Sequence, residues 1–246
     1  MNEDYFNAFG QLAESLDNDM LITGRHVFHH DQISAIVNDI KNKLELNSDN
    51  NLLEIGCNIG VILRPLAAEV SSAVGIDHSS CIKKFYSDGL PENIELISGC
   101  WPDVSLKQKF DRILVYSVLH YLESIESTYK FIFSCIEQLS DGGKLLIADL
   151  PNEDMLQRHQ KSTIGKKISQ EYKEICDKSV NSNEIEYKYK EEIFSSIENK
   201  SFINDDLLTG LVKMIRAENL DAYLLPQPET LPMCFTREDL LICKRD

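Results

Sequence analysis

Short apolar runs alternate with longer amphipathic stretches over the first 150 residues of the chain. The runs are four or five residues long, rich in Ile, Leu and Val, and bounded by polar residues or glycine, which predicts buried strands. The predicted strands cover 51–55, 73–76, 94–97, 112–116 and 144–148, and helices are predicted at about 60–69, 79–87 and 124–139. Asp141-Gly142-Gly143 predicts a turn before the last of these strands. This alternation favours an α/β fold whose parallel sheet is covered by helices on both faces.

The segments that flank this alternating part have other patterns. Ahead of it, apolar residues at helical spacing predict a helix from about 33 to 44, with Asp31 as its N-cap. After Pro151, residues 152–203 are polar and charged and lack a strand pattern over about fifty residues. Such a segment is too long for a simple connection, so we predict a helical insertion or lid.

The C-terminal part returns to apolar runs. A helix is predicted near 205–218, and strands are predicted at 222–225 and 239–243. The proline-rich link between the two strands favours a hairpin over another strand–helix–strand unit. The pattern therefore predicts seven strands and a single domain of residues 1–246.

Composition and charge exclude several functional classes. The net charge of −15 and the pI near 4.8 disfavour a nucleic-acid partner, which needs a basic surface. Seven scattered cysteines without a C-x-x-C spacing predict neither a disulfide framework nor a structural zinc site. No apolar run approaches the roughly 20 residues that cross a membrane, and the first residues are acidic, unlike a secretory signal. We therefore expect a cytoplasmic protein that does not bind a membrane.

The most informative stretch, Leu53-Glu54-Ile55-Gly56-Cys57-Asn58-Ile59-Gly60, leads from the first predicted strand into a helix. Here the chain must turn sharply and let a ligand approach its backbone, and glycine permits both. Asp77 ends the next strand, where a carboxylate can accept hydrogen bonds from ribose hydroxyls. Taken separately, a tight turn and an acidic residue at the end of a strand each have a purely structural explanation. Together, in this strand–helix–strand context, they favour a ribose-containing cofactor.

The spacing of the glycines narrows the choice of cofactor. The G-x-G-x-x-G pattern of dinucleotide sites is missing. Glu54-x-Gly56-x-Asn58-x-Gly60 instead resembles the first motif, (D/E)-x-G-x-G-x-G, of the class I methyltransferases that use S-adenosylmethionine (SAM). Asn58 stands at the middle glycine, and asparagine tolerates left-handed backbone angles better than most residues. Further segments similar to this family are 74–77, 110–122, 141–147 and the C-terminal hairpin.

This resemblance implies a Rossmann-like, doubly wound, mostly parallel seven-stranded sheet with a C-terminal antiparallel hairpin. It also implies a helical cover at 1–45, a lid at 152–203, SAM as cofactor and S-adenosylhomocysteine (SAH) as product. Glu54 would hold the methionine amino group and Asp77 the ribose. Arg25 would meet the SAM carboxylate or an anionic substrate, or lie on the surface. The other predicted cofactor-binding residues are Gly56, Cys57, Asn58, Gly60, His78, Cys100, Trp101 and Ser117, with packing as an alternative role for Trp101.

Methyl transfer needs an aligned nucleophile, and a hydroxyl nucleophile is helped by a base. His120, in the loop after the fourth strand, is the first candidate for this catalytic role, and Asp149, which ends the fifth strand, is the second. His29 and His30 are weaker candidates. Ser117 stands where catechol-type enzymes carry a metal-binding carboxylate, so we predict no metal.

The expected acceptor is a small-molecule hydroxyl or amine, with sugars and sugar derivatives among the classes considered. The segment Tyr116–Leu119 lacks the motif of enzymes that methylate the amino groups of nucleic-acid bases. A non-catalytic SAM-binding subunit and a nucleotide-binding oxidoreductase stay open as alternative functions.

Overall fold

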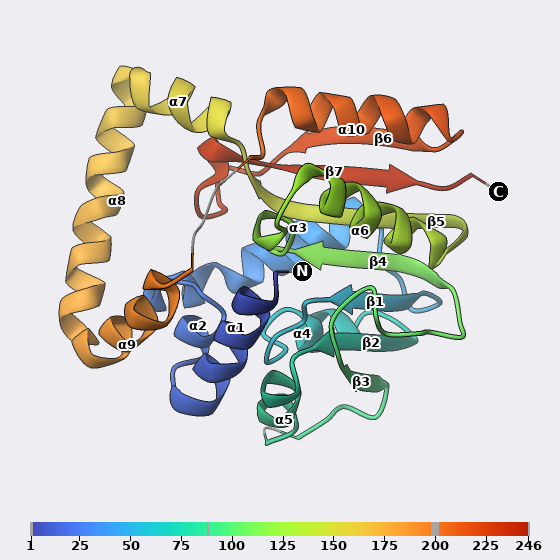
Figure 1. Ribbon diagram of the computed structural model, residues 1–246, viewed down its shortest axis with the longest axis horizontal. Coiled ribbons are helices and arrows are strands. Elements are labelled where there is room, and N and C mark those ends of the chain that lie inside the picture. Colours follow the sequence, from blue (N-terminus) through green and yellow to red (C-terminus); the bar gives the residue numbers. More distant parts are fainter. Residues whose placement is uncertain (1, 88, 198–201, 246) are drawn as a thin grey trace.

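The computed structural model describes residues 2–87, 89–197 and 202–245, and in these residues the strands form one seven-stranded sheet of order β3-β2-β1-β4-β5-β7-β6 (Figure 1). All neighbouring pairs are parallel except those that involve β7, which runs antiparallel to both β5 and β6. The strands are β1 (Asn51–Ile55), β2 (Ser72–Asp77), β3 (Ile94–Ser98), β4 (Phe110–Tyr116), β5 (Leu139–Pro151), β6 (Asp221–Pro226) and β7 (Arg237–Cys243). The predicted sheet and C-terminal hairpin are confirmed.

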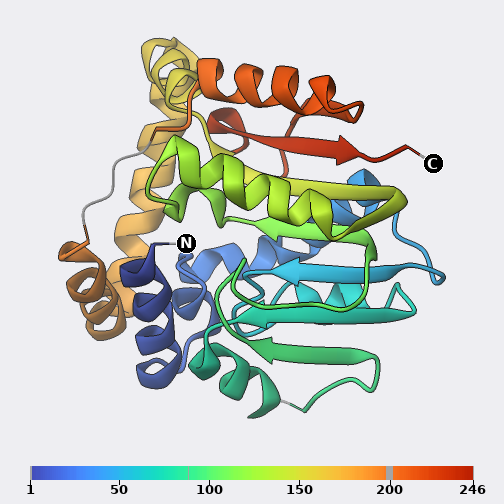
Figure 2. The ribbon, with the colours of Figure 1, turned by 45° about the vertical axis from the view of Figure 1, so that its right-hand side comes forward.

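Helices cover both faces of the sheet, as expected for apolar parallel strands. One face packs against α3 (Ile33–Leu44), α4 (Leu63–Ala67) and α5 (Ser79–Ser87). The other packs against α6 (Ile125–Glu137) and α10 (Asp205–Ala217), which lie in front of the sheet in Figure 2. The strand order reverses between β1 and β4, so a crevice opens at their carboxyl ends.

Two local predictions at element boundaries are wrong. Asp31 does not cap α3, because a 3₁₀ helix, η1 (Val27–Gln32), runs directly into it and Gln32 is the cap residue. The turn expected at residues 141–143 lies within β5, which begins at Leu139. The pairing of β5 with β4 shifts register there, so the glycines form an irregularity inside one long strand instead of a turn before it.

The predicted insertion is helical. It consists of α7 (Glu153–Lys161), α8 (Thr163–Ser182) and α9 (Glu184–Ser195) in the described residues. Helix α8 runs along one end of the molecule and carries α9 to the N-terminal helices α1 (Glu3–Ser15) and α2 (Asp19–Ile22) (Figure 1). Segments far apart in the sequence thus lie together beyond the carboxyl ends of the strands.

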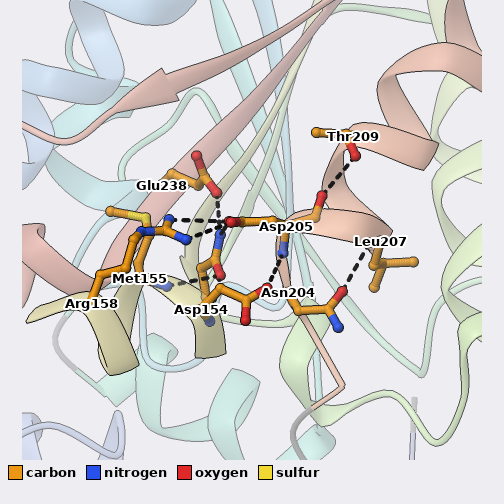
Figure 3. Close-up of polar contacts among 9 residues, drawn as sticks. Asp154, Met155, Arg158, Asn204, Asp205, Leu207, Thr209 and Glu238 are labelled. Carbon is orange, nitrogen blue, oxygen red and sulfur yellow. Dashed lines mark hydrogen bonds and ion pairs between the residues drawn. The ribbon is translucent and has the colours of Figure 1, made fainter. Parts of the chain in front are cut away.

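Both ends of the insertion are fixed at one point of the sheet (Figure 3). Asn152 caps α7, and its amide donates to the carboxylates of Asp205 and Glu238 at 2.8 and 2.6 Å. Arg158 of α7 forms an ion pair with Asp205, whose backbone N–H donates to Asp154. The start of α7, the start of α10 and the start of β7 are therefore joined by one polar network.

No helix in the described part of the chain combines the length and apolar character needed to cross a membrane.

Candidate active site

The turn after β1 has the backbone geometry that its glycines suggested. Gly56 has φ +82°, and a Cβ added there would lie 2.5 Å from a methyl group of Val118. Asn58 has φ +48°, in the left-handed region that asparagine tolerates. The Gly56 N–H donates to the carbonyl of Ile76, which ties the turn to β2. The chain can therefore turn tightly here only with a residue that lacks a side chain at Gly56.

Gly60 and Cys57, two further residues of the predicted cofactor loop, face the interior. A Cβ on Gly60 would lie 2.2 Å from the ring of Phe85, and Gly60 has φ +84°. The Cys57 side chain is buried in the core between the sheet and α3–α5. Gly60 is thus needed for the packing of α5 against the turn.

Asp77 stands at the end of β2, beside the turn. One carboxylate oxygen accepts from the backbone N–H of Asn58 at 2.7 Å, and the other accepts from the N–H of His78 at 2.6 Å. Burial raises the pKa of Asp77 and these bonds oppose the rise. The carboxylate is thereby held at one orientation, with lone pairs left for further donors.

Glu54 lies deeper, on β1, and is 2% exposed. Its Oε2 atom has no hydrogen-bond partner among the described residues. Burial raises the pKa of Glu54 to about 8, with the charge of Arg25 opposing the rise and that of Asp77 adding to it. A buried acceptor without a donor is costly, so this position suits a cationic ligand group.

Gly56, Asn58 and Asp77 line a cavity of about 480 Å³, including the part open to solvent. Three other predicted cofactor-binding residues, Glu54, Cys57 and Gly60, are outside its described lining. Gly56 and Asn58 of the turn line the cavity together with Phe6 and Phe9 of α1. It is lined by Phe6, Phe9, Thr23, Arg25, Gly56, Asn58, Asp77, Tyr116, Ser117, Val118 and Tyr121.

His78, Cys100 and Trp101 are outside the described lining of this cavity. The His78 ring packs under α1, with its centroid 4.9 Å from that of Phe6. Trp101 is 3% exposed, lies in the core with α6, and donates its indole N–H to Ser134 at 2.7 Å. For Trp101 the structure therefore favours the alternative packing role over cofactor binding.

A second cavity, of about 780 Å³ including its open part, adjoins the first. The two share Thr23, Arg25, Tyr116, Ser117 and Tyr121. The second cavity is also lined by Gly24, His26, His29, Ile36, His120, Asp149, Tyr172, Pro232, Met233 and Arg237.

Ser117 and Asp149 mark the boundary between the sheet and this second cavity. Ser117 directly follows β4 and has φ +57°. Asp149, which was expected to end the fifth strand, lies within β5 and has φ +62° where the β5–β7 pairing is interrupted between Ile147 and Leu150. The Ser117 hydroxyl donates to the Asp149 carboxylate. Arg237 forms an ion pair with the same carboxylate at 3.2 Å and donates to the Asp149 carbonyl at 2.8 Å. Both side-chain contacts of Asp149 thus involve its Oδ2 atom.

The histidines of the second cavity are neutral near pH 7. Burial and the charge of Arg237 lower the pKa of His120 to about 3, and its Nδ1 has no partner among the described residues. Burial, with His26 and Arg25, lowers the pKa of His29 to about 4. His30, the other weaker candidate, is exposed beside Asp31. A neutral imidazole can accept a proton, so His120 and His29 are both chemically suited to act as a base.

Sequence reasoning missed Arg237 and Tyr172. Arg237 begins β7, and because β7 runs antiparallel, its first residue lies at the edge where β5 ends. The predicted antiparallel hairpin could have indicated that the first residues of the last strand lie at this edge. Tyr172 comes from α8 and reaches the site only through the path of the insertion. No local pattern indicates that contact.

A family model described as a methyltransferase domain matches residues 22–182. The chain belongs to the class I SAM-dependent methyltransferases. It is therefore an enzyme of this class, and SAM is its cofactor. No curated protein sequence matches it significantly.

Several solved structures have a similar fold at low sequence identity. Phosphoethanolamine N-methyltransferase 1 of Haemonchus contortus, with phosphoethanolamine and SAH, has a TM-score of 0.68 and 15% identity over 98% of this chain. This chain spans about half, 48%, of that protein. The N-methyltransferase NodS of Bradyrhizobium japonicum with SAH has a TM-score of 0.61 and 14% identity over 99% of this chain and 100% of its own. The DhpI–SAM–HEP complex has a TM-score of 0.62 and 13% identity, and the match covers 98% of this chain and 96% of its own.

The residues of the first cavity, together with Glu54, which interacts electrostatically with the lining residues Arg25 and Asp77, fit SAM. Glu54 offers an unpartnered buried carboxylate to an ammonium group, and Asp77 offers oriented acceptors to hydroxyl groups. Gly56 leaves the backbone accessible. When bound, SAM supplies an electrophilic methyl group, and the protein's task is to align a nucleophile with it and exclude water.

Proposed function

We propose that this methyltransferase methylates a hydroxyl or amine of a small molecule bound in the second cavity. The observation that carries the proposal is the shared wall of the two cavities, formed by Arg25, Tyr116 and Ser117 among others. A nucleophile in the second cavity would approach the cofactor through this shared region. Two proteins of similar structure are N-methyltransferases, and one of them binds the small molecule phosphoethanolamine, which supports this class of acceptor.

His120 is our proposed general base. It is neutral at pH 7, lines the second cavity and has an Nδ1 that is unpartnered within the described structure. Asp149, the second candidate, is already engaged by Ser117 and Arg237, so we assign it the role of orienting these groups. An amine acceptor would have to bind in its neutral form, because an ammonium ion is too weak an acid to give its proton to an imidazole whose pKa is about 3.

We propose that α8, α9 and the N-terminal segment act as a lid over both cavities. Tyr172 of α8 lines the second cavity, and Phe6 and Phe9 of α1 line the first. Such a cover would exclude water during the transfer and would have to open for exchange of ligands.

The first test is calorimetric titration of the protein with SAM, SAH and NAD, with Asp77→Ala as the comparison. We expect micromolar affinity for SAM and SAH, a loss of at least tenfold in Asp77→Ala, and no binding of NAD. An acceptor screen with sugars and other small alcohols and amines is then carried out, in which methyl transfer is measured by the release of SAH. SAM binding without turnover of any acceptor would favour the non-catalytic subunit, and absence of SAM binding would overturn the cofactor site.

A further inference from the structure

The second cavity has a charge balance opposite to that of the whole chain, which has 40 acidic and 25 Lys and Arg residues. Among the described residues that line it, the charged side chains are Arg25, Arg237 and Asp149. Asp149 is already bound by Arg237 and the Ser117 hydroxyl. Arg25, the remaining charged side chain, forms no ion pair with the other described residues that line this cavity.

Arg25 is poorly satisfied by its neighbours. Its guanidinium lies 3.4 Å from the Thr23 carbonyl and 3.5 Å from the Ser117 hydroxyl, at the outer limit of hydrogen bonding. None of the ion pairs between described residues includes it. Lys190 of α9 lies behind it and donates to the carbonyls of Gly24 and Arg25 at 2.6 and 3.1 Å.

The titration behaviour of neighbouring groups supports a positive potential in this region. Burial and the charge of Arg25 lower the pKa of Lys190 to about 8. The charge of Arg237 is the largest electrostatic contribution to the low pKa of His120, ahead of the opposing charge of Asp149. An anion bound nearby would relieve these repulsions.

His29 adds an unsatisfied polar atom. The side chain is 5% exposed, its Nε2 lies 3.1 Å from the Tyr172 hydroxyl, and its Nδ1 has no partner among the described residues. If the hydroxyl donates to Nε2, the neutral ring carries its hydrogen on Nδ1. Nδ1 is then a buried donor that lacks an acceptor, which a ligand oxygen would supply.

We propose that the acceptor carries an oxyanionic group, a carboxylate or a phosphate, which binds to Arg25 and Arg237 with the Nδ1 of His29 as a further donor. This inference rests on the proposed function, because it assigns the anion to the substrate of the second cavity. A guanidinium presents paired N–H donors that match an oxyanion. His120 stays free to accept the proton of the nucleophile. The acceptor is then a hydroxyl or amine compound held in place by its negative end.

The test uses the full chain saturated with SAH and labelled on histidine for NMR, with the His29 signal assigned by its loss in His29→Gln. Inorganic phosphate and sodium acetate are titrated separately, against sodium chloride at equal ionic strength. We expect a saturable shift of the His29 signal with at least one of the two anions, and the stronger binder distinguishes a phosphate from a carboxylate. Arg237→Gln should weaken this binding at least tenfold, and Arg237→Lys by less.

Arg245→Gln is the matched control, because Arg245 pairs with Asp221 at the far edge of the sheet and is exposed. Equal weakening in this control, or no saturable shift with either anion, would overturn the anion site. Thermal unfolding of each variant identifies a folding defect, and Arg237→Lys decides the outcome if Arg237→Gln does not fold. SAH binding is measured on the same samples. If the unmodified protein does not bind SAH, the proposed cofactor site is overturned. If it binds SAH but neither anion, only the proposed anion site is overturned.

Discussion

Glu54 and His120 show how position sets the chemistry of a side chain. Burial raises the pKa of Glu54 to about 8 and lowers that of His120 to about 3, because burial disfavours the charged form of both groups. Without a ligand, Glu54 is therefore largely protonated at pH 7, and His120 is neutral. The cofactor's ammonium group would favour the ionised carboxylate of Glu54, whereas His120 stays neutral.

Replacing Glu54 by Gln should stabilise the protein without cofactor and weaken SAM binding. The raised pKa means that the folded state binds more protons than the unfolded state between about pH 4.5 and 8. The contribution of Glu54 to stability is therefore full below pH 4.5 and is lost as the pH rises towards 8. We expect Glu54→Gln to raise the melting temperature by roughly 5 °C at pH 8, with little change at pH 4.

Calorimetry of the same variant completes this test. SAH affinity should fall at least tenfold in Glu54→Gln and should increase with pH up to about 8 in the unmodified protein. An unchanged affinity would mean that Glu54 does not contact the cofactor.

Replacing His120 by Asn should lower kcat by about 10²–10⁴-fold with little change in SAH affinity, because the base is removed and the first cavity is kept. With a pKa of about 3, His120 is neutral throughout pH 5–8, so its titration should not shape the rate profile there. The measurement is SAH release with the acceptor found in the screen. A kcat within twofold of the unmodified enzyme would contradict a role as base.

At the scale of elements, Tyr187 connects α9, α8 and the start of η1. It is 3% exposed, and its hydroxyl accepts from the backbone N–H of Val27 at 3.1 Å. The same hydroxyl lies 2.9 Å from Ser179 and 3.2 Å from the Nδ1 of His26. This hydroxyl is one of several contacts that hold the insertion against the N-terminal segment, together with those of Lys190 and Tyr172. The two ends of the insertion are fixed at the sheet by the network around Asn152.

Tyr187→Phe should loosen the cover without affecting the sheet. The Val27 N–H loses its acceptor, at a cost of about 1–3 kcal/mol for the closed arrangement. We expect faster hydrogen exchange in residues 24–29 and in α9, and a several-fold higher KM for the acceptor. Tyr189→Phe is the control, since Tyr189 is exposed and bonds only Ser15 in the described structure. Equal exchange in both variants would argue against Tyr187 as a fastening point.

At the scale of the whole molecule, a buried charge network joins α3 to the active-site edge. Lys43 lies 2.6 Å from the carboxylates of both Asp39 and Asp239. Asp239 also accepts from the backbone N–H of Asp149 at 2.9 Å and from Gln227 at 3.0 Å. The β5–β7 pairing is interrupted between Ile147 and Leu150, so the Asp239 side chain replaces a strand hydrogen bond at Asp149.

Lys43→Met should destabilise the protein by about 3–5 kcal/mol, because it leaves Asp39 and Asp239 without their counter-ion. Urea unfolding measures this change. Lys41→Met is the matched control from the same helix, since Lys41 pairs with Glu69 at the surface, and it should cost less than about 1 kcal/mol. Similar losses in both variants would contradict the network's importance. A single cooperative transition would also support the predicted single domain of residues 1–246.

The pattern of the sequence predicted most elements because each depends on neighbours a few positions away. Apolar runs marked the strands, the glycines of the turn marked the crevice, and Asp77 and Glu54 marked a site for a ribose and an amino group. The boundary errors at Asp31 and residues 141–143 arose because a preceding 3₁₀ helix and strand pairing overrode the local signals.

The sequence by itself thus determined the sheet, the family and the turn after β1 with Asp77 beside it, because these lie in one continuous motif and its adjoining strands. Only the tertiary structure decided that Trp101 is a core residue and that Gly60 serves the packing of α5. It also decided the composition of the second cavity, where Arg25, His29, Tyr172 and Arg237 meet. Those side chains come from three separate segments, the N-terminal segment with Arg25 and His29, α8 and β7. The path of the chain, which no local periodicity encodes, brings them together.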